Sequence, residues 1–199
     1  MPEMTHDQRL RLTAGTNIRA TADRIVTTWN RATDTNKEAG ARWYSEGEQF
    51  IDNLAAQTGR SRELVAAVVA HLSPRTTWKR NLFGATMLLT TGEAPTCMSN
   101  NVDRARRAMD ADRPLDTLNG PKTRRFAANL LGDRESVTVD MWAVRVALGQ
   151  RDDSEQLLAR VGVYDALEHA YRTAARRIGV DPVTAQATTW IVARNGRAA

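Results

Sequence analysis

The sequence predicts an all-α fold, and three observations lead to that prediction. Apolar residues recur with the period of a helix in almost every segment. No stretch alternates apolar and polar residues for long enough to predict a β-sheet. Residues that begin or end helices, such as Ser61, Asp140 and Gly92, stand at the edges of the periodic segments.

The expected helices follow one another with short connections. The first covers residues 17–31, and the second covers 36–57 and stops at Gly59. Ser61 predicts an N-cap for a helix over 62–72, which Pro74 ends. Asp140 predicts the cap of a helix that ends before Gly149, after an extended segment over 136–139. The remaining helices are expected at 77–89, 99–109, 115–118, 122–131, 154–160, 164–178 and 182–193. The first ~14 and last ~5 residues are expected to fray.

Charge favours a polyanionic partner. The 199 residues carry a formal net charge of +5, and basic side chains displace counterions from phosphate. A basic surface without a nucleic-acid partner is an alternative that charge alone leaves open. One cysteine and three widely spaced histidines predict neither a disulfide framework nor a metal site, and no cofactor is expected.

Hydropathy predicts a cytoplasmic protein, which we expect to be a monomer. No apolar run approaches the ~20 residues that a membrane helix needs, so no membrane association is expected. The first residues are polar and do not form the apolar core of a secretory signal.

Lysine is rare in this chain. Of 28 basic residues only Lys37, Lys79 and Lys122 are lysines. Lys122 follows a tight turn, Leu118-Asn119-Gly120-Pro121, at the start of a predicted helix. Glycine allows a close backbone approach to a DNA strand, and the first N–H groups of a helix bind anions. The segment therefore predicts a phosphate-binding hairpin, with an ordinary helical corner as the alternative.

Asp140 lies eighteen residues after Lys122. A carboxylate at a helix start is most often a cap, and a hairpin lysine is most often a phosphate contact. Together they could perform chemistry at C1′ of a deoxynucleotide. An unprotonated amine can attack C1′ to form a Schiff base, while a carboxylate stabilises the cationic sugar and handles the proton.

The stretch 115–149 resembles the hairpin and Asp loop of the helix-hairpin-helix DNA glycosylases, the superfamily that includes endonuclease III and the 8-oxoguanine glycosylases. The stretch 68–89 is similar to the helix–loop–helix that lines DNA in that family, and 185–197 to its closing helix. The resemblance implies catalysis by Lys122 and Asp140. It also implies DNA contacts from Arg75, Thr76, Lys79, Gly120, Thr123, Arg124 and Arg125.

Two tryptophans are candidates for a base pocket. Trp78 and Trp142 could each stack on an extruded base, although a core position is the alternative for both. The chain departs from the family pattern in its hairpin, which lacks a second glycine, and in Arg75, which replaces the family's glutamine. The four-cysteine iron–sulfur cluster of many relatives is excluded by the single cysteine.

The resemblance implies one two-lobed domain with DNA bound between the lobes. Residues 15–60 and 150–197 are expected in the first lobe, and 61–149 in the second. The expected activity is base excision, with a β-lyase step to follow. Two alternatives stay open: a phage-type enzyme on the same fold that attaches or processes groups on modified pyrimidines, and a non-catalytic DNA-binding module.

Overall fold

The computed structural model describes residues 4–149 and 153–194, and every regular element in these ranges is a helix. The predicted all-α class is therefore confirmed. The chain forms two compact units, each described here by itself. Unit 1 combines the segment up to Trp43 with the segment from Arg134 onward, whereas unit 2 is the continuous stretch Tyr44–Asp133.

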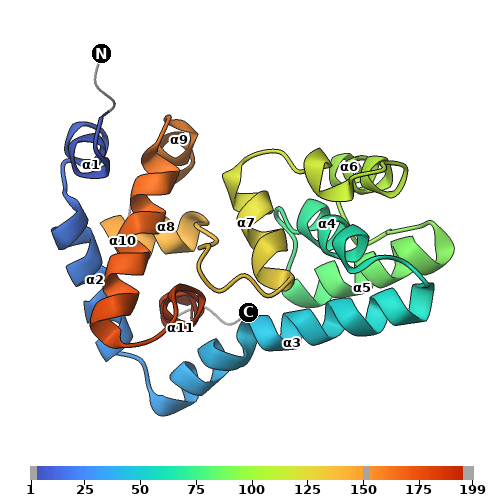
Figure 1. Ribbon diagram of the computed structural model, residues 1–199, viewed down its shortest axis with the longest axis horizontal. Helices are drawn as coiled ribbons and strands as arrows, with labels where there is room; N and C mark the ends of the chain where they lie inside the picture. The colour runs from blue at the N-terminus through green and yellow to red at the C-terminus, as the bar shows by residue number, and fades with distance from the viewer. Residues whose placement is uncertain (1–3, 150–152, 195–199) are drawn as a thin grey trace. The chain divides into compact units, whose positions relative to one another are not determined.

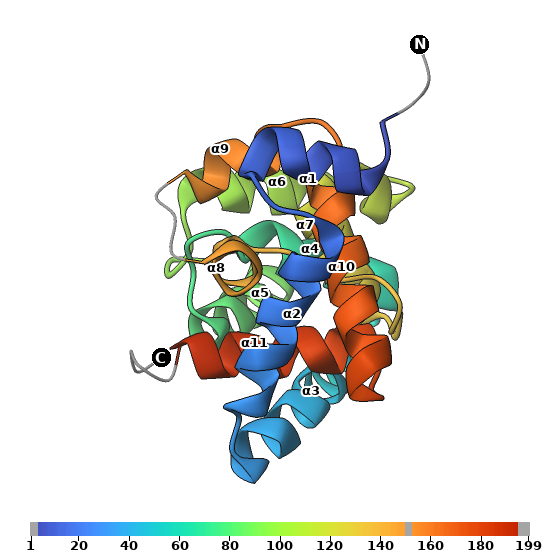
Figure 2. The same ribbon diagram turned by 90° about the vertical axis from the view of Figure 1, so that its left-hand side faces the viewer.

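Unit 1 is built around one long amphipathic helix. This helix, α10 (Val163–Ile178), packs against α1 (His6–Ala14), α2 (Ile18–Asn30) and α11 (Pro182–Arg194), as Figures 1 and 2 show. The short helices α8 (Met141–Leu148) and α9 (Ser154–Ala159) complete the unit. Tyr171 is fully buried in the core that these helices share. Burial of apolar side chains from both segments of the chain therefore holds unit 1 together.

Unit 2 surrounds helix α4 (Arg62–Leu72), in which every residue from Leu64 to Leu72 is buried. Around it lie α5 (Trp78–Thr91), α6 (Ser99–Met109) and α7 (Pro121–Leu130), together with the one-turn 3-10 helix η1 (Pro114–Thr117) (Figure 1). Helix α3 (Asp34–Thr58) contains the boundary between the units. A helix that is apolar on all sides is typical of a domain centre.

The unit boundary differs from the expected lobe boundary. The sequence predicted 61–149 in one lobe, but the segment from Arg134 to Gly149 belongs to unit 1. Val137, Val139 and the apolar residues of α8 are buried in the core of that unit. The extended segment before Asp140, and Asp140 itself, therefore belong to unit 1.

The expectation that the first residues fray is wrong for residues 6–14. Thr5 and Gln8 form a reciprocal capping box at the start of α1, and Leu10 is fully buried against the core of unit 1. Asp7 also accepts a hydrogen bond from the N–H of Ile18 (3.0 Å). The capping box and the buried leucine together stabilise a helix in a segment whose polar composition predicted a frayed end. The final residues, 195–199, lie outside the described ranges.

The predicted helix ends are accurate where a side chain caps its own helix. Asn17, Ser61, Asp140 and Asp181 each accept a hydrogen bond from the N–H three residues later. Gly92 ends α5 in the left-handed conformation (φ 82°) that glycine adopts most readily. The segment 115–118, expected as a helical turn, forms the 3-10 helix η1 one residue earlier.

No helix in the described ranges is long and apolar enough to cross a membrane.

His71 makes the stability of unit 2 depend on pH. Its side chain is buried on α4, and its Nε2 lies 2.9 Å from Oγ1 of Thr117. That hydroxyl donates its hydrogen to the Pro114 carbonyl oxygen, so Nε2–H of His71 is the donor to Thr117. Burial, reinforced by Arg104 and Arg107, lowers the pKa of His71 to about 4.

We expect the free energy of unfolding to fall by roughly 1–3 kcal/mol as the pH decreases from about 6.5 to about 4. The unfolded chain binds a proton at His71 in this range and the folded chain does not. Chemical denaturation at several pH values measures the change. His71→Gln keeps a donor for Thr117 and does not titrate, so the free energy of unfolding of that variant should not show this decrease between pH 6.5 and 4. The same decrease in that variant would contradict the assignment.

Candidate functional site

Asp140 is held through both oxygens of its carboxylate. Oδ1 accepts a hydrogen bond from the backbone N–H of Ala143 (2.8 Å) and thereby caps α8. Oδ2 accepts one from the indole N–H of Trp190 on α11 (3.0 Å). A cap uses only one of the two oxygens. The second bond, to a residue fifty positions later in the chain, fixes the plane of the carboxylate as well as its position.

Helix α3 and α11 position the indole of Trp190. Gly40 on α3 lies so close to Thr188 that a Cβ at this position would overlap the threonine backbone. Three residues later, the Trp43 ring packs against Trp190 with centroids 5.1 Å apart. The Arg194 guanidinium lies 4.3 Å from the Trp190 ring centroid. One aromatic contact and one cation–π contact therefore restrict the orientation of the Trp190 ring.

The extended segment that precedes Asp140 is bound to α10. The buried carboxylate of Glu168 accepts the N–H of Val137 (2.8 Å). The Tyr164 hydroxyl accepts the N–H of Val139 and donates to the carbonyl of Val137, both at 2.9 Å. Buried backbone groups are costly to leave unpaired, so these bonds fix the path of the chain into Asp140.

Tyr171 extends this support to the first turn of α8. Its hydroxyl donates to the carbonyl of Ala143 (3.0 Å), the residue whose N–H binds Asp140. Burial raises the pKa of Tyr171 far above its ordinary value, so the hydroxyl remains a donor at all physiological pH values. The two groups that donate to the Asp140 carboxylate itself, the Ala143 N–H and the Trp190 indole N–H, are both neutral.

Lys122 occupies the first turn of α7 in unit 2. Gly120, with φ 81°, is the N-cap and Pro121 is the first helical residue. The glycine makes no side-chain cap, and proline has no N–H, so the N–H groups of Lys122 and Thr123 have no acceptor within the described residues. The Lys122 side chain is half-buried. This start of α7 has the features of the predicted anion-binding turn.

The side chains of Thr123 and Arg124 form hydrogen bonds with the backbone of the turn that precedes them. The Thr123 hydroxyl donates to the Asn119 carbonyl (2.6 Å), and Nε of Arg124 donates to the Leu118 carbonyl (3.0 Å). The Arg124 side chain is otherwise exposed, whereas Arg125 is half-buried. Threonine and arginine therefore brace the turn, and the remaining donors of Arg124 face solvent.

Arg75 adopts a backbone conformation that is unfavourable for its residue type. Its φ is 57°, and among the described residues it is the only non-glycine with a positive φ. The loop around it is tied down, because buried Asn101 on α6 donates to the Pro74 carbonyl (2.9 Å). Thr76 donates its N–H back to Ser73 (3.3 Å). The loop presents the exposed Arg75 side chain at a conformational cost of about 1 kcal/mol.

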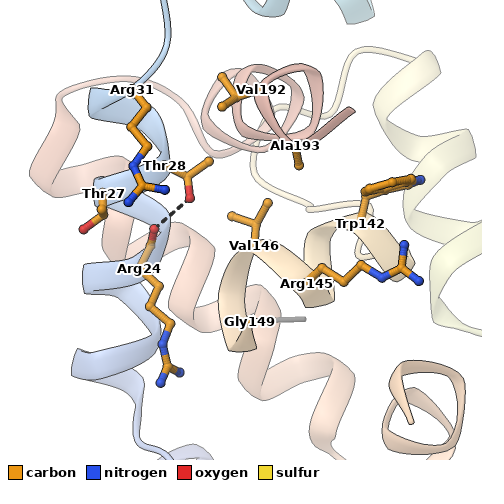
Figure 3. Close-up of a pocket in the computed structure, with 10 residues that line it drawn as sticks. All are labelled: Arg24, Thr27, Thr28, Arg31, Trp142, Arg145, Val146, Gly149, Val192 and Ala193. Atoms are coloured by element: carbon orange, nitrogen blue, oxygen red, sulfur yellow. Dashed lines mark hydrogen bonds between the residues drawn. The ribbon is translucent and has the colours of Figure 1, made fainter. Parts of the chain in front are cut away.

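The two tryptophans differ in their surroundings. Trp78, at the start of α5, packs edge-on against Phe126 of α7 with centroids 6.1 Å apart. This contact is typical of a core residue. Trp142, in the first turn of α8, lines an open pocket in unit 1, with the Arg145 guanidinium 4.9 Å from its ring centroid (Figure 3).

The predicted residues fall into two sets. Lys122 lies in unit 2 with all the predicted DNA contacts, which are Arg75, Thr76, Lys79, Gly120, Thr123, Arg124 and Arg125. Asp140 lies in unit 1 with Trp142. Sequence reasoning missed the residues that support Asp140: Trp190, Tyr164, Glu168 and Tyr171. No local signal marks these residues, because each acts across 25 or more positions.

A family model described as "Family of unknown function (DUF7178)" matches residues 7–197. No curated protein and no solved structure matches the chain.

Proposed function

The chain belongs to the DUF7178 family of unknown function, and we propose that it is a DNA base-excision glycosylase that uses Lys122 and Asp140. The observation that carries the proposal is the hydrogen bonding of Asp140. Both of its oxygens accept N–H donors, and the segment before it is bound to α10. Such support exceeds what a helix cap requires and suits a carboxylate that must face a developing positive charge.

The proposed reaction begins with the Lys122 amine and C1′ of the target deoxynucleotide. The amine nitrogen forms a bond to C1′, and the N-glycosidic bond breaks with its electron pair leaving on the base. Asp140 stabilises the cationic sugar and accepts the proton that the amine releases. The C1′–O4′ bond then breaks, O4′ takes up the proton held by Asp140, and the nitrogen lone pair completes a protonated imine at C1′. This imine acidifies the neighbouring C2′, so that loss of a C2′ proton and of the 3′ phosphate follows by β-elimination. No step requires a metal ion or an organic cofactor.

The DNA partner is supported by the surface of unit 2. Among the residues that the structure describes, the N–H groups of Lys122 and Thr123 at the start of α7 have no acceptor, and the next residue, Arg124, is exposed. Arg75 is exposed in the loop before α5, and Lys79 is exposed in the first turn of that helix. Contacts of this kind bind the phosphate backbone without reading sequence, so the binding should weaken steeply as salt increases.

A panel of duplexes tests the activity. Each duplex carries one damaged or modified base, and abasic sites are detected after incubation with the purified protein. The proposal predicts release of at least one base, with release abolished in Lys122→Ala. If no base is released, the chain is better explained as a base-modifying enzyme or as a DNA-binding module.

Arg75 allows function to be separated from stability. Glycine adopts a positive φ without steric cost, so we expect Arg75→Gly to raise the free energy of unfolding, measured by thermal unfolding, by about 0.5–1 kcal/mol. Loss of the guanidinium should weaken DNA binding at the same time. Arg75→Ala is the matched control, because it loses the guanidinium and keeps the backbone conformation. Equal binding losses with a stability gain only in the glycine variant are expected, and a glycine variant less stable than the alanine variant would contradict the strain.

A further inference from the structure

Unit 1 contains a pocket whose lining is unlike the Asp140 surroundings. Its volume is about 410 Å³, and helices α2, α8 and α11 form its walls (Figure 3). This volume lies within the range of small-molecule sites. Arg24 on α2 and Arg31, the residue that follows α2, lie on one side, and Trp142 and Arg145 extend from α8 on the other. Neither Lys122 nor Asp140 lines it.

Arg24, Arg31 and Arg145 bring three positive charges to the lining of the pocket. Within the part of the chain that the structure describes, Arg24, Arg31 and Arg145 form no ion pair. Asp23, the neighbour of Arg24 in sequence, pairs instead with Arg177 (2.6 Å). Like charges that face one pocket repel one another, so their placement favours an anionic occupant.

Arg145 adds a donor that lacks an acceptor. Its Nε is buried and has no hydrogen-bond partner among the described residues. A buried N–H without an acceptor costs free energy that an anion can recover. The guanidinium is held over the Trp142 ring at 4.9 Å, so its direction is restricted before any ligand arrives.

The rest of the lining is apolar or already hydrogen-bonded. Val146 and Val192 contribute aliphatic surface. Thr27 and Thr28 donate their hydroxyl hydrogens to carbonyls of their own helix (2.8 and 3.0 Å), so the arginines supply the donors that a ligand meets. Arg24 and Arg31 on one side match a phosphate, and the surface of Trp142 and Val146 on the other side matches a base.

We propose that this pocket binds a nucleotide, with the phosphate on Arg24 and Arg31 and the base against Trp142 and Val146. The nucleotide is either a free monophosphate or one unit of a DNA strand, because both present the same phosphate and base. The inference goes beyond base excision and does not depend on it, since the pocket includes neither proposed catalytic residue.

Calorimetric titration of the full chain tests the pocket with four probes: thymidine 5′-monophosphate, thymidine, inorganic phosphate and a short oligothymidylate. Binding of the monophosphate but not the oligonucleotide would identify a free nucleotide, and the reverse would identify a DNA strand. Thymidine should bind at least about tenfold more weakly than either, because it lacks the phosphate.

The double variant Arg24→Ala/Arg31→Ala should lower the affinity by about tenfold or more. Both side chains are exposed, so the fold should tolerate their loss, which circular dichroism can verify. Arg19→Ala is the matched control, since Arg19 is an exposed arginine on the same helix that does not line the pocket. The proposal is overturned if neither nucleotide probe binds, if inorganic phosphate binds equally well, or if the double variant matches Arg19→Ala.

Discussion

Borohydride should link this protein covalently to substrate DNA through Lys122. An amine that attacks C1′ passes through an imine, and borohydride reduces that imine to a stable amine. Protein incubated with substrate DNA and borohydride should therefore give a slower-migrating band on a denaturing gel. The chain has three lysines, so the nucleophile can be assigned by removing each in turn.

The trapped band should disappear in Lys122→Ala and persist in Lys37→Ala and Lys79→Ala. Lys37 lies on α3 with its ammonium 5.9 Å from the Trp29 ring centroid, and Lys79 is exposed in the first turn of α5. A band lost only in one of these two variants would move the nucleophile to that lysine. Base release without any trapped band would indicate that water is the nucleophile.

Replacing Asp140 by Asn should lower base release by about 10²–10³-fold, because the negative charge that opposes the sugar cation is lost. The structure shows that this substitution also changes hydrogen bonding. An asparagine that caps Ala143 with its carbonyl oxygen must turn its NH₂ group toward the indole N–H of Trp190. Two donors then face one another, so a loss of activity in the single variant has two possible causes.

The double variant Asp140→Asn/Trp190→Phe separates the two causes. Phenylalanine removes the indole donor, so the asparagine no longer faces an N–H group. We expect the double variant to be as inactive as Asp140→Asn, and Trp190→Phe alone to lose roughly tenfold or less. Thermal unfolding measured in parallel shows whether each variant is folded. Recovery of activity in the double variant would mean that Asp140 acts as a cap and that its charge is dispensable.

Helix positions could be predicted from the sequence because their signals are local. Ser61, Asp140 and Asp181 each cap a helix whose first residues follow directly, and each cap forms as expected. The first helix was missed although Thr5 and Gln8 have the spacing of a capping box. That signal was present, but the polar composition around it favoured a frayed end.

The surroundings of Asp140 and the arginine pocket could not be predicted in the same way. The second hydrogen-bond donor to the carboxylate, Trp190, is positioned by the close packing of α11 against α3 at Gly40. No local sequence pattern predicts which helices pack against each other in this way. The pocket combines residues from positions 24–31, 142–149 and 192–193. Arg24, Thr28 and Arg31 do share one face of α2 by their spacing, which indicates a polar stripe but not what lies opposite.

The discontinuous path of unit 1 affects the order in which the chain acquires its structure. Unit 2 is a single stretch, Tyr44–Asp133, and can form as soon as that stretch has been synthesised. Helices α1 and α2 must wait for α10, their main packing partner, which lies more than a hundred residues later. Closing such a long loop is slow, so amides of α4 should gain protection from hydrogen exchange before those of α2 during refolding. The Asp140 carboxylate, which depends on α10 and α11, is then among the last groups to reach its final position.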